Sequence, residues 1–109
     1  PLPDHNVAFV VTNNGSSAYR ISGGGSNPAT DNPTINLFRG FTYRFQNQAG
    51  GSHPFEIRES NGGATVTDGI SGSTTGFLFY TPAQSLSAGT AYVYQCTSHG
   101  GMVGVVNIL

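Results

Sequence analysis

Residues 92–102 read YVYQCTSHGGM. This stretch holds the single cysteine and the single methionine of the chain, with a histidine midway between them. Cys96, His99 and Met102 follow one another at intervals of three residues. A thiolate, an imidazole and a thioether form a soft ligand set that suits copper. The stretch therefore predicts a metal site.

A trigonal site with two histidines, one cysteine and a distant axial thioether needs a second imidazole. Besides His99, the chain contains only His5 and His53. His53 follows a Gly-Gly-Ser turn at residues 50–52 and precedes a predicted strand. His5 lies in a chain end that is costly to order. We therefore predict His53 as the second imidazole.

The strand that leads into the cysteine alternates in character. Tyr92, Tyr94 and Cys96 share one face, because successive side chains of a strand point to opposite sides. This pattern predicts that the sulfur points into the core beside aromatic rings. A dry sulfur suits a metal site whose redox potential depends on solvent access.

Short β-branched and aromatic segments alternate with glycine, proline, asparagine and serine clusters about every ten residues, which is typical of an all-β fold. No segment has a capped helical period, and only a short helical turn is expected, at residues 83–86. We predict two packed sheets in one domain spanning residues 1–109, without repeats or linkers, and a loop at residues 60–73. The eight expected strands are residues 7–12, 18–21, 34–38, 41–46, 55–59, 76–80, 90–96 and 103–109.

The chain has 109 residues, four arginines, no lysine, five acidic residues and a formal charge of −1. Such a balance gives no footprint for nucleic acid or for an anionic membrane surface. Charged residues make up 8% of the chain and there are sixteen glycines, so neutral polar groups must keep it in solution. This composition favours a periplasmic or secreted protein. A free thiol there is a liability that metal binding removes.

No apolar run approaches the roughly 18 residues of a membrane span. The chain opens with neither a basic segment nor the apolar segment of a signal peptide. We therefore expect a soluble protein without a membrane span, and a monomer. A signal peptide already removed, or a larger parent protein, remains open.

With these residues in view, the sequence resembles the cupredoxins, the small blue copper proteins that include plastocyanin and amicyanin. The resemblance implies an eight-stranded Greek-key β-sandwich that holds one type 1 copper ion and carries single electrons between redox partner proteins, without turning over a substrate. It covers most of the chain from about residue 32 onward, through LFRGFTYRFQN at 37–47, GSHPF at 51–55, FYTP at 79–82, GTAYVYQC at 89–96 and GVVNI at 104–108.

Carried over by position, the resemblance makes His53, Cys96 and His99 the copper ligands and Met102 the axial thioether. The spacing C-x2-H-x2-M is similar to the short loop of amicyanin. Asn47 matches the asparagine that opens the equivalent loop of plastocyanin, and we expect a structural role for it.

Three positions depart from the family pattern. Pro54 stands where the family often has an asparagine that braces the two ligand loops, so the brace is expected from Ser52 or Thr97. Ser98 keeps an amide that proline removes in amicyanin, and this amide would tune the potential if it reached the cysteine sulfur. Gln95 stands where plastocyanin has an exposed tyrosine beside a partner patch. A second electron exit of that kind is therefore not expected, whereas entry and exit near His99 are.

Other functions remain open from the sequence alone. The domain could store, deliver or sense copper, or it could be a structural β-sandwich module of a larger secreted protein. A nucleophilic pair of Cys96 and His99 is disfavoured, because so tight a turn directs both side chains toward one central atom. Glu56 and Glu59 fall on opposite faces of a strand, so they do not indicate an acid–base pair.

Overall fold

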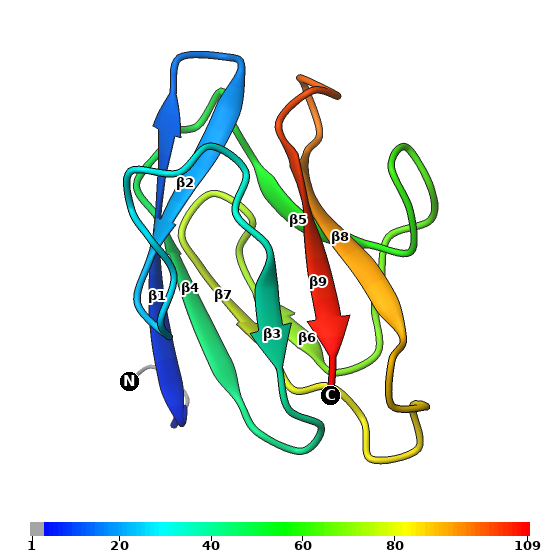
Figure 1. The fold of residues 1–109 in the computed structure, drawn as a ribbon. Coiled ribbons are helices and arrows are strands. Elements are labelled where there is room, and N and C mark those ends of the chain that lie inside the picture. Colours follow the sequence, from blue (N-terminus) through cyan, green and yellow to red (C-terminus); the bar gives the residue numbers. More distant parts are fainter. Residues whose placement is uncertain (1–3) are drawn as a thin grey trace.

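The computed structural model describes residues 4–109, and these residues form strands, turns and loops without an α-helix. No helix in this part of the chain could therefore cross a membrane. Residues 1–3, part of the chain end expected to be loose, lie outside the described range. The strands, shown in Figure 1, are β1 (Val7–Asn14), β2 (Ala18–Ser22), β3 (Ile35–Leu37), β4 (Tyr43–Asn47), β5 (Phe55–Arg58), β6 (Ile70–Gly72), β7 (Phe77–Tyr80), β8 (Ala91–Cys96) and β9 (Val103–Ile108).

The strands form two sheets. One has the order β2-β1-β4-β7-β6 and the other has the order β3-β9-β8-β5. Most neighbours are antiparallel, but β1 pairs parallel with β4, and β3 pairs parallel with β9. The all-β sandwich predicted from the sequence is confirmed. Its strand count of eight is wrong, because the two sheets contain nine strands.

The additional strand is β6, which lies inside the predicted loop at residues 60–73. It has three residues and pairs only with β7, from Ile70 opposite Tyr80 to Gly72 opposite Leu78. So short an edge strand needs backbone pairing but no alternation of side chains, so its sequence carries no strand signal. The helical turn expected at residues 83–86 is a single turn with one hydrogen bond, from Leu86 N–H to the oxygen of Ala83 (3.1 Å).

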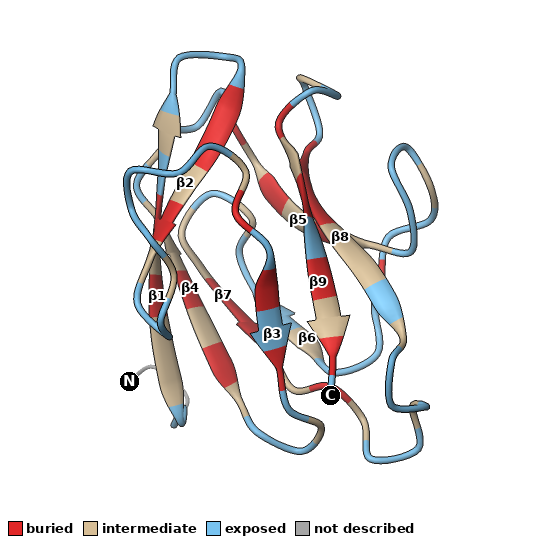
Figure 2. Cartoon of the chain, viewed as in Figure 1, coloured by how far each residue is buried: buried red, intermediate tan, exposed pale blue. Residues whose placement is uncertain are grey.

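Buried residues alternate with more exposed ones along several strands, so each sheet presents an apolar face to the other (Figure 2). Aromatic rings carry the contact across the sandwich. Phe9 stacks on Phe45 at 5.0 Å between ring centroids, Phe45 lies 5.2 Å from Phe55, and Phe55 stacks on Tyr94 at 5.3 Å. Since the first two rings belong to one sheet and the last two to the other, this row of rings joins the sheets.

Replacing Phe45 at the middle of this row tests its contribution. Phe45→Ala removes a fully buried ring, and we expect the free energy of unfolding to fall by about 3–5 kcal/mol. Phe38→Ala is the matched control, because that ring is 53% exposed. It should cost less than about 1 kcal/mol. Denaturant unfolding of the metal-free protein measures both, and equal losses would contradict the role given to the row of rings.

Candidate metal centre

Two connections at one end of the sandwich carry the predicted ligands (Figure 1). The first joins β4 to β5 and contains His53, and the second joins β8 to β9 and contains His99. β5 and β8 are antiparallel neighbours, with Phe55 directly opposite Cys96. This register brings the segment before Phe55 alongside the segment after Cys96. His53 and Cys96, which are 43 positions apart in the sequence, thus become neighbours at the end of one sheet.

The cysteine sulfur lies between the two imidazoles. Cys96 Sγ is 3.9 Å from His53 Nδ1 and 3.7 Å from His99 Nδ1. One ligand atom from each of the three residues lies within 4.8 Å of the other two. The ring centroids of His53 and His99 are 5.0 Å apart. The three side chains named from the sequence therefore converge on one point.

These separations test whether a metal ion fits. Protein bonds to a zinc ion are about 2.0 Å long from histidine nitrogen and about 2.3 Å long from cysteine sulfur. With bonds of that length, nitrogen and sulfur lie roughly 3.5 Å apart at a tetrahedral angle and roughly 3.7 Å apart at a trigonal one. The separations of 3.7 and 3.9 Å fit the trigonal angle or a slightly wider one. A trigonal plane of two histidines and one cysteine is characteristic of blue copper.

Met102 completes the donor set at the far end of the same loop. Its side chain is fully buried and belongs to the same core cluster as Cys96. Met102 N–H donates to the oxygen of His99 (3.0 Å), and Cys96 N–H donates to the oxygen of Met102 (2.9 Å). These two bonds close the loop on itself. The four side chains are thus placed for a single copper ion.

Asn47 fixes the loop that carries His53. Its Nδ2 donates to the oxygens of His53 and Thr74, both at 2.9 Å, and its Oδ1 accepts from Ala49 N–H (2.8 Å). His53 N–H also donates to the oxygen of Gly50 (3.1 Å), which closes the turn before the ligand. The polar atoms of the Asn47 side chain therefore bind backbone groups of the loop, which is a structural role.

The two ligand loops are joined by a backbone hydrogen bond. Thr97 N–H donates to the oxygen of Pro54 at 3.3 Å, so Thr97 connects the loops through its main chain. Within residues 4–109, Ser52 makes no hydrogen bond of this kind. Ser98 is exposed, and no hydrogen bond among the described residues joins its amide to the cysteine sulfur.

The sequence gives no indication of the part played by Tyr19, a fully buried residue of β2. Its hydroxyl lies 2.8 Å from the oxygens of both His53 and Pro54 and donates to this pair. Burial raises the pKa of Tyr19 above its ordinary value, and the nearby Cys96 and Glu56 side chains raise it further. The hydroxyl therefore keeps its proton and remains a donor. Residues 18–22 look like any other strand, so only the fold reveals this contact.

His5 lies outside the cluster. It is exposed, and its ring centroid is 6.4 Å from that of Phe79. The sequence-based preference for His53 over His5 therefore agrees with the geometry.

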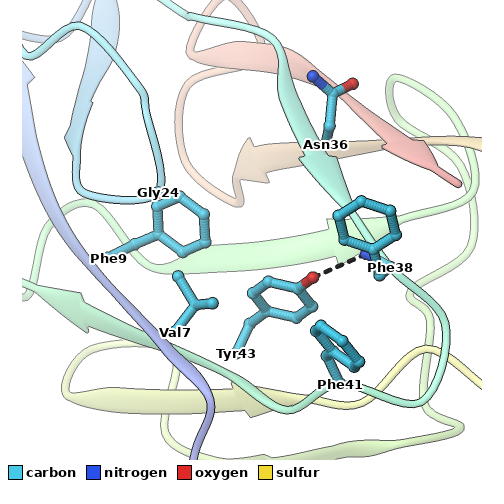
Figure 3. Close-up of a pocket in the computed structure, with 7 residues that line it drawn as sticks. All are labelled: Val7, Phe9, Gly24, Asn36, Phe38, Phe41 and Tyr43. Atoms are coloured by element: carbon cyan, nitrogen blue, oxygen red, sulfur yellow. Dashed lines mark hydrogen bonds between the residues drawn. The ribbon is translucent and has the colours of Figure 1, made fainter.

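A separate hollow of about 180 Å³ lies near the turn between β3 and β4, at the end of the sandwich opposite the β8–β9 loop (Figures 1 and 3). Tyr43 Oη accepts a hydrogen bond from Phe38 N–H at its edge (2.7 Å). None of its lining side chains is a histidine, a cysteine or a methionine, so the hollow has none of the side-chain types gathered around Cys96. The lining residues are Val7, Phe9, Gly24, Asn36, Phe38, Phe41 and Tyr43.

Three buried tyrosines predict the alkaline behaviour of the metal-free protein. Burial is the main cause that raises the pKa of Tyr19, Tyr80 and Tyr94 above the ordinary value of about 10. The folded state favours the neutral phenol. The contribution of these tyrosines to the free energy of unfolding is therefore complete below pH 10, and it falls above pH 10 as the tyrosines of the unfolded chain ionise. Above pH 10, each of these tyrosines should lower the free energy of unfolding by about 1.4 kcal/mol per pH unit.

Tyr19→Phe isolates one of these contributions. It should lower the free energy of unfolding at pH 7 by about 1–2 kcal/mol, since the oxygens of His53 and Pro54 lose a buried donor. It should also reduce the fall in stability between pH 10 and 11 by the share of one tyrosine. Denaturant unfolding at a series of pH values measures both effects, and an unchanged slope would show that the Tyr19 pKa is not raised.

No family model matches the chain, and no curated protein matches it. Solved structures do match. The purple cupredoxin from Nitrosopumilus maritimus superposes with a TM-score of 0.54 at 17% identity, covering 95% of this chain and 100% of that one. A reduced rusticyanin superposes with a TM-score of 0.52 at 22% identity, covering 94% of this chain and 77% of that one.

An amicyanin mutant, in its reduced Cu(I) form at pH 4, superposes with a TM-score of 0.52 at 17% identity and covers 99% of this chain and 86% of its own. At such identities the likeness concerns the fold. The chain has the cupredoxin fold, and the histidine, cysteine, histidine and methionine side chains typical of a type 1 copper site are gathered at one end of it.

Proposed function

We propose that this protein binds one type 1 copper ion through His53, Cys96 and His99, with Met102 as the axial ligand, and carries single electrons between redox partners. One observation supports this more than any other: two imidazole Nδ1 atoms lie 3.7 and 3.9 Å from a buried thiol in a cupredoxin fold. Copper, when bound, supplies the one-electron change between Cu(II) and Cu(I).

The chain holds its donors in one geometry. Cys96 ends a strand that pairs on both sides, with β5 and with β9. Hydrogen bonds from Asn47 and Tyr19 hold the peptide of His53. Donors fixed in this way move little when the charge of the site changes, and small rearrangement favours fast electron transfer. The cysteine is 1% exposed, so its sulfur is kept from water.

We expect electrons to enter and leave the site through the imidazole of His99. His53 is only 7% exposed, whereas His99 is partly exposed and is followed by the exposed Gly100 and Gly101. His99 turns Nδ1 toward the sulfur, so the opposite edge of its ring faces away from it. A redox partner that docks over the two glycines would approach this edge closely.

The partner is a redox protein under this proposal, and no substrate is turned over. The composition favours a periplasmic or extracellular protein, where the thiol of Cys96 is protected by burial and by the metal. We propose that the protein acts as a monomer.

Copper titration tests the assignment. One equivalent of Cu(II) should produce an intense blue absorption and the electron paramagnetic resonance spectrum of a type 1 site. Cys96→Ser should abolish the absorption, since the copper–thiolate bond is its source. His53→Ala should weaken or abolish it, whereas His5→Ala, the matched histidine outside the cluster, should leave it unchanged. A Cys96→Ser protein that stays blue would refute the assignment of the sulfur.

Two rates separate electron transfer from copper storage or delivery. Rapid electron self-exchange with slow release of Cu(I) to a chelator is expected here. The reverse pattern would show that the site handles copper and does not carry electrons.

A further inference from the structure

Gln95 is a polar side chain buried next to the thiol. It lies between Tyr94 and Cys96 on β8, so its side chain points to the opposite face of the sheet from theirs. That face would ordinarily be open to solvent, yet Gln95 is only 2% exposed. Hydrogen bonds to Asn61 and Gly62 show that the connection between β5 and β6 covers it.

Every hydrogen-bonding position of the Gln95 carboxamide is used. Its Nε2 donates to Asn61 Oδ1 (2.6 Å) and to the oxygen of Gly100 (3.2 Å). Its Oε1 accepts from Gly62 N–H (2.8 Å) and from Arg58 Nη1 (3.3 Å). Two donors and two acceptor sites are all that a glutamine side chain offers. A buried amide that is fully satisfied in this way holds its partners in one arrangement.

One of these bonds reaches the ligand loop. Gly100 directly follows His99, so the bond from Gln95 to the oxygen of Gly100 restrains the chain just after the imidazole. On the other side, Met102 N–H holds the oxygen of His99 itself. Gly100 and Gly101 are exposed and carry no side chain to pack, so hydrogen bonds to their backbone oxygens restrain this part of the loop. Asn32 Nδ2 donates to the oxygen of Gly101 (3.3 Å), and Gln95 supplies the bond to the oxygen of Gly100.

On its other side, the Gln95 side chain is connected to strand β5. Glu56 lies directly opposite Gln95 in the pairing of β5 with β8. Arg58, two residues further along β5, pairs with Glu56 at 2.9 Å and donates to Gln95. Both charged side chains are 19% exposed, so this pair is partly shielded from water. Gln95 therefore connects the sheet, the loop at residues 60–63 and the loop that carries His99.

We propose that Gln95 is a positioning residue for His99, which fixes the ligand loop to the sheet and to the loop at residues 60–63. The inference rests on the proposed function, since it assigns Gln95 the task of limiting the movement of His99 between the two oxidation states. It also makes Asn61, which is exposed, an indirect contact to the metal site.

Gln95→Met tests the proposal, because methionine keeps the length of the side chain and removes all four hydrogen bonds without adding charge. In the metal-free protein we expect amide hydrogen exchange of Cys96 and Met102, whose N–H groups close the ligand loop, to become about tenfold faster. Exchange in β1 should not change. In the copper protein, electron self-exchange should become about tenfold slower and the hyperfine pattern of the copper should change.

Two further variants sharpen the test. Gln84→Met makes the same change at an exposed glutamine between β7 and β8, and it should alter none of these quantities. Asn61→Ala removes one surface partner of Gln95 and should raise the same exchange rates about threefold. In the Gln95→Met background it should add nothing further, because its effect passes through Gln95. Asn61→Ala also keeps the proposal testable if Gln95→Met fails to fold.

The outcomes separate the two proposals. A wild-type protein that binds no copper overturns the proposed function, while hydrogen exchange of the metal-free variants still decides whether Gln95 holds the loop. A blue wild-type protein, with unchanged exchange and self-exchange in Gln95→Met and Asn61→Ala, overturns the role of Gln95 alone.

Discussion

The pairing of β5 with β8 is the constraint on which the metal centre depends. Phe55 lies opposite Cys96 in this pairing, and both side chains point into the core. A shift of one residue would turn either β5 or β8 over, because side chains of a strand alternate between its faces. The sulfur would then leave the core, or the segment with His53 would lose its place beside the second ligand loop. The apolar core thus sets the geometry of the polar site through the register of two strands.

Hydrogen bonds to the main chain then fix what the register brings together. Asn47 and Tyr19 bind the backbone oxygen of His53, and Thr97 N–H binds that of Pro54. None of these contacts requires the metal. Together they give each of these two backbone oxygens two donors. A buried oxygen left without any donor would cost about 1–3 kcal/mol. The folded chain can therefore hold the shape of the site before an ion binds. The conformational entropy lost in ordering the four side chains is then lost on folding and not on metal binding.

The proposed ligands stand out in the sequence because their chemistry is rare in this chain. There is one cysteine and one methionine, and only three histidines compete for the remaining places. Strand alternation also predicted correctly that Tyr94 and Cys96 are buried. Tyr19, Gln95 and β6 could not be found in the same way. Their roles depend on which loop covers which face and on backbone groups distant in the sequence, and a local pattern contains neither.

The burial of Gln95 also bears on the path of electrons. In a strand of this kind, the side chain next to the cysteine could lead from the sulfur to the side of the sandwich. Here the side chain of Gln95 is covered by Asn61 and Gly62, and its polar atoms form hydrogen bonds with the surrounding loops. Of His53, Cys96, His99 and Met102, His99 alone is more than marginally exposed. Under the proposed function, the network that keeps the Gln95 side chain from solvent also supports the chain beside His99, so one arrangement of side chains would favour the exposed edge of His99 as the exit.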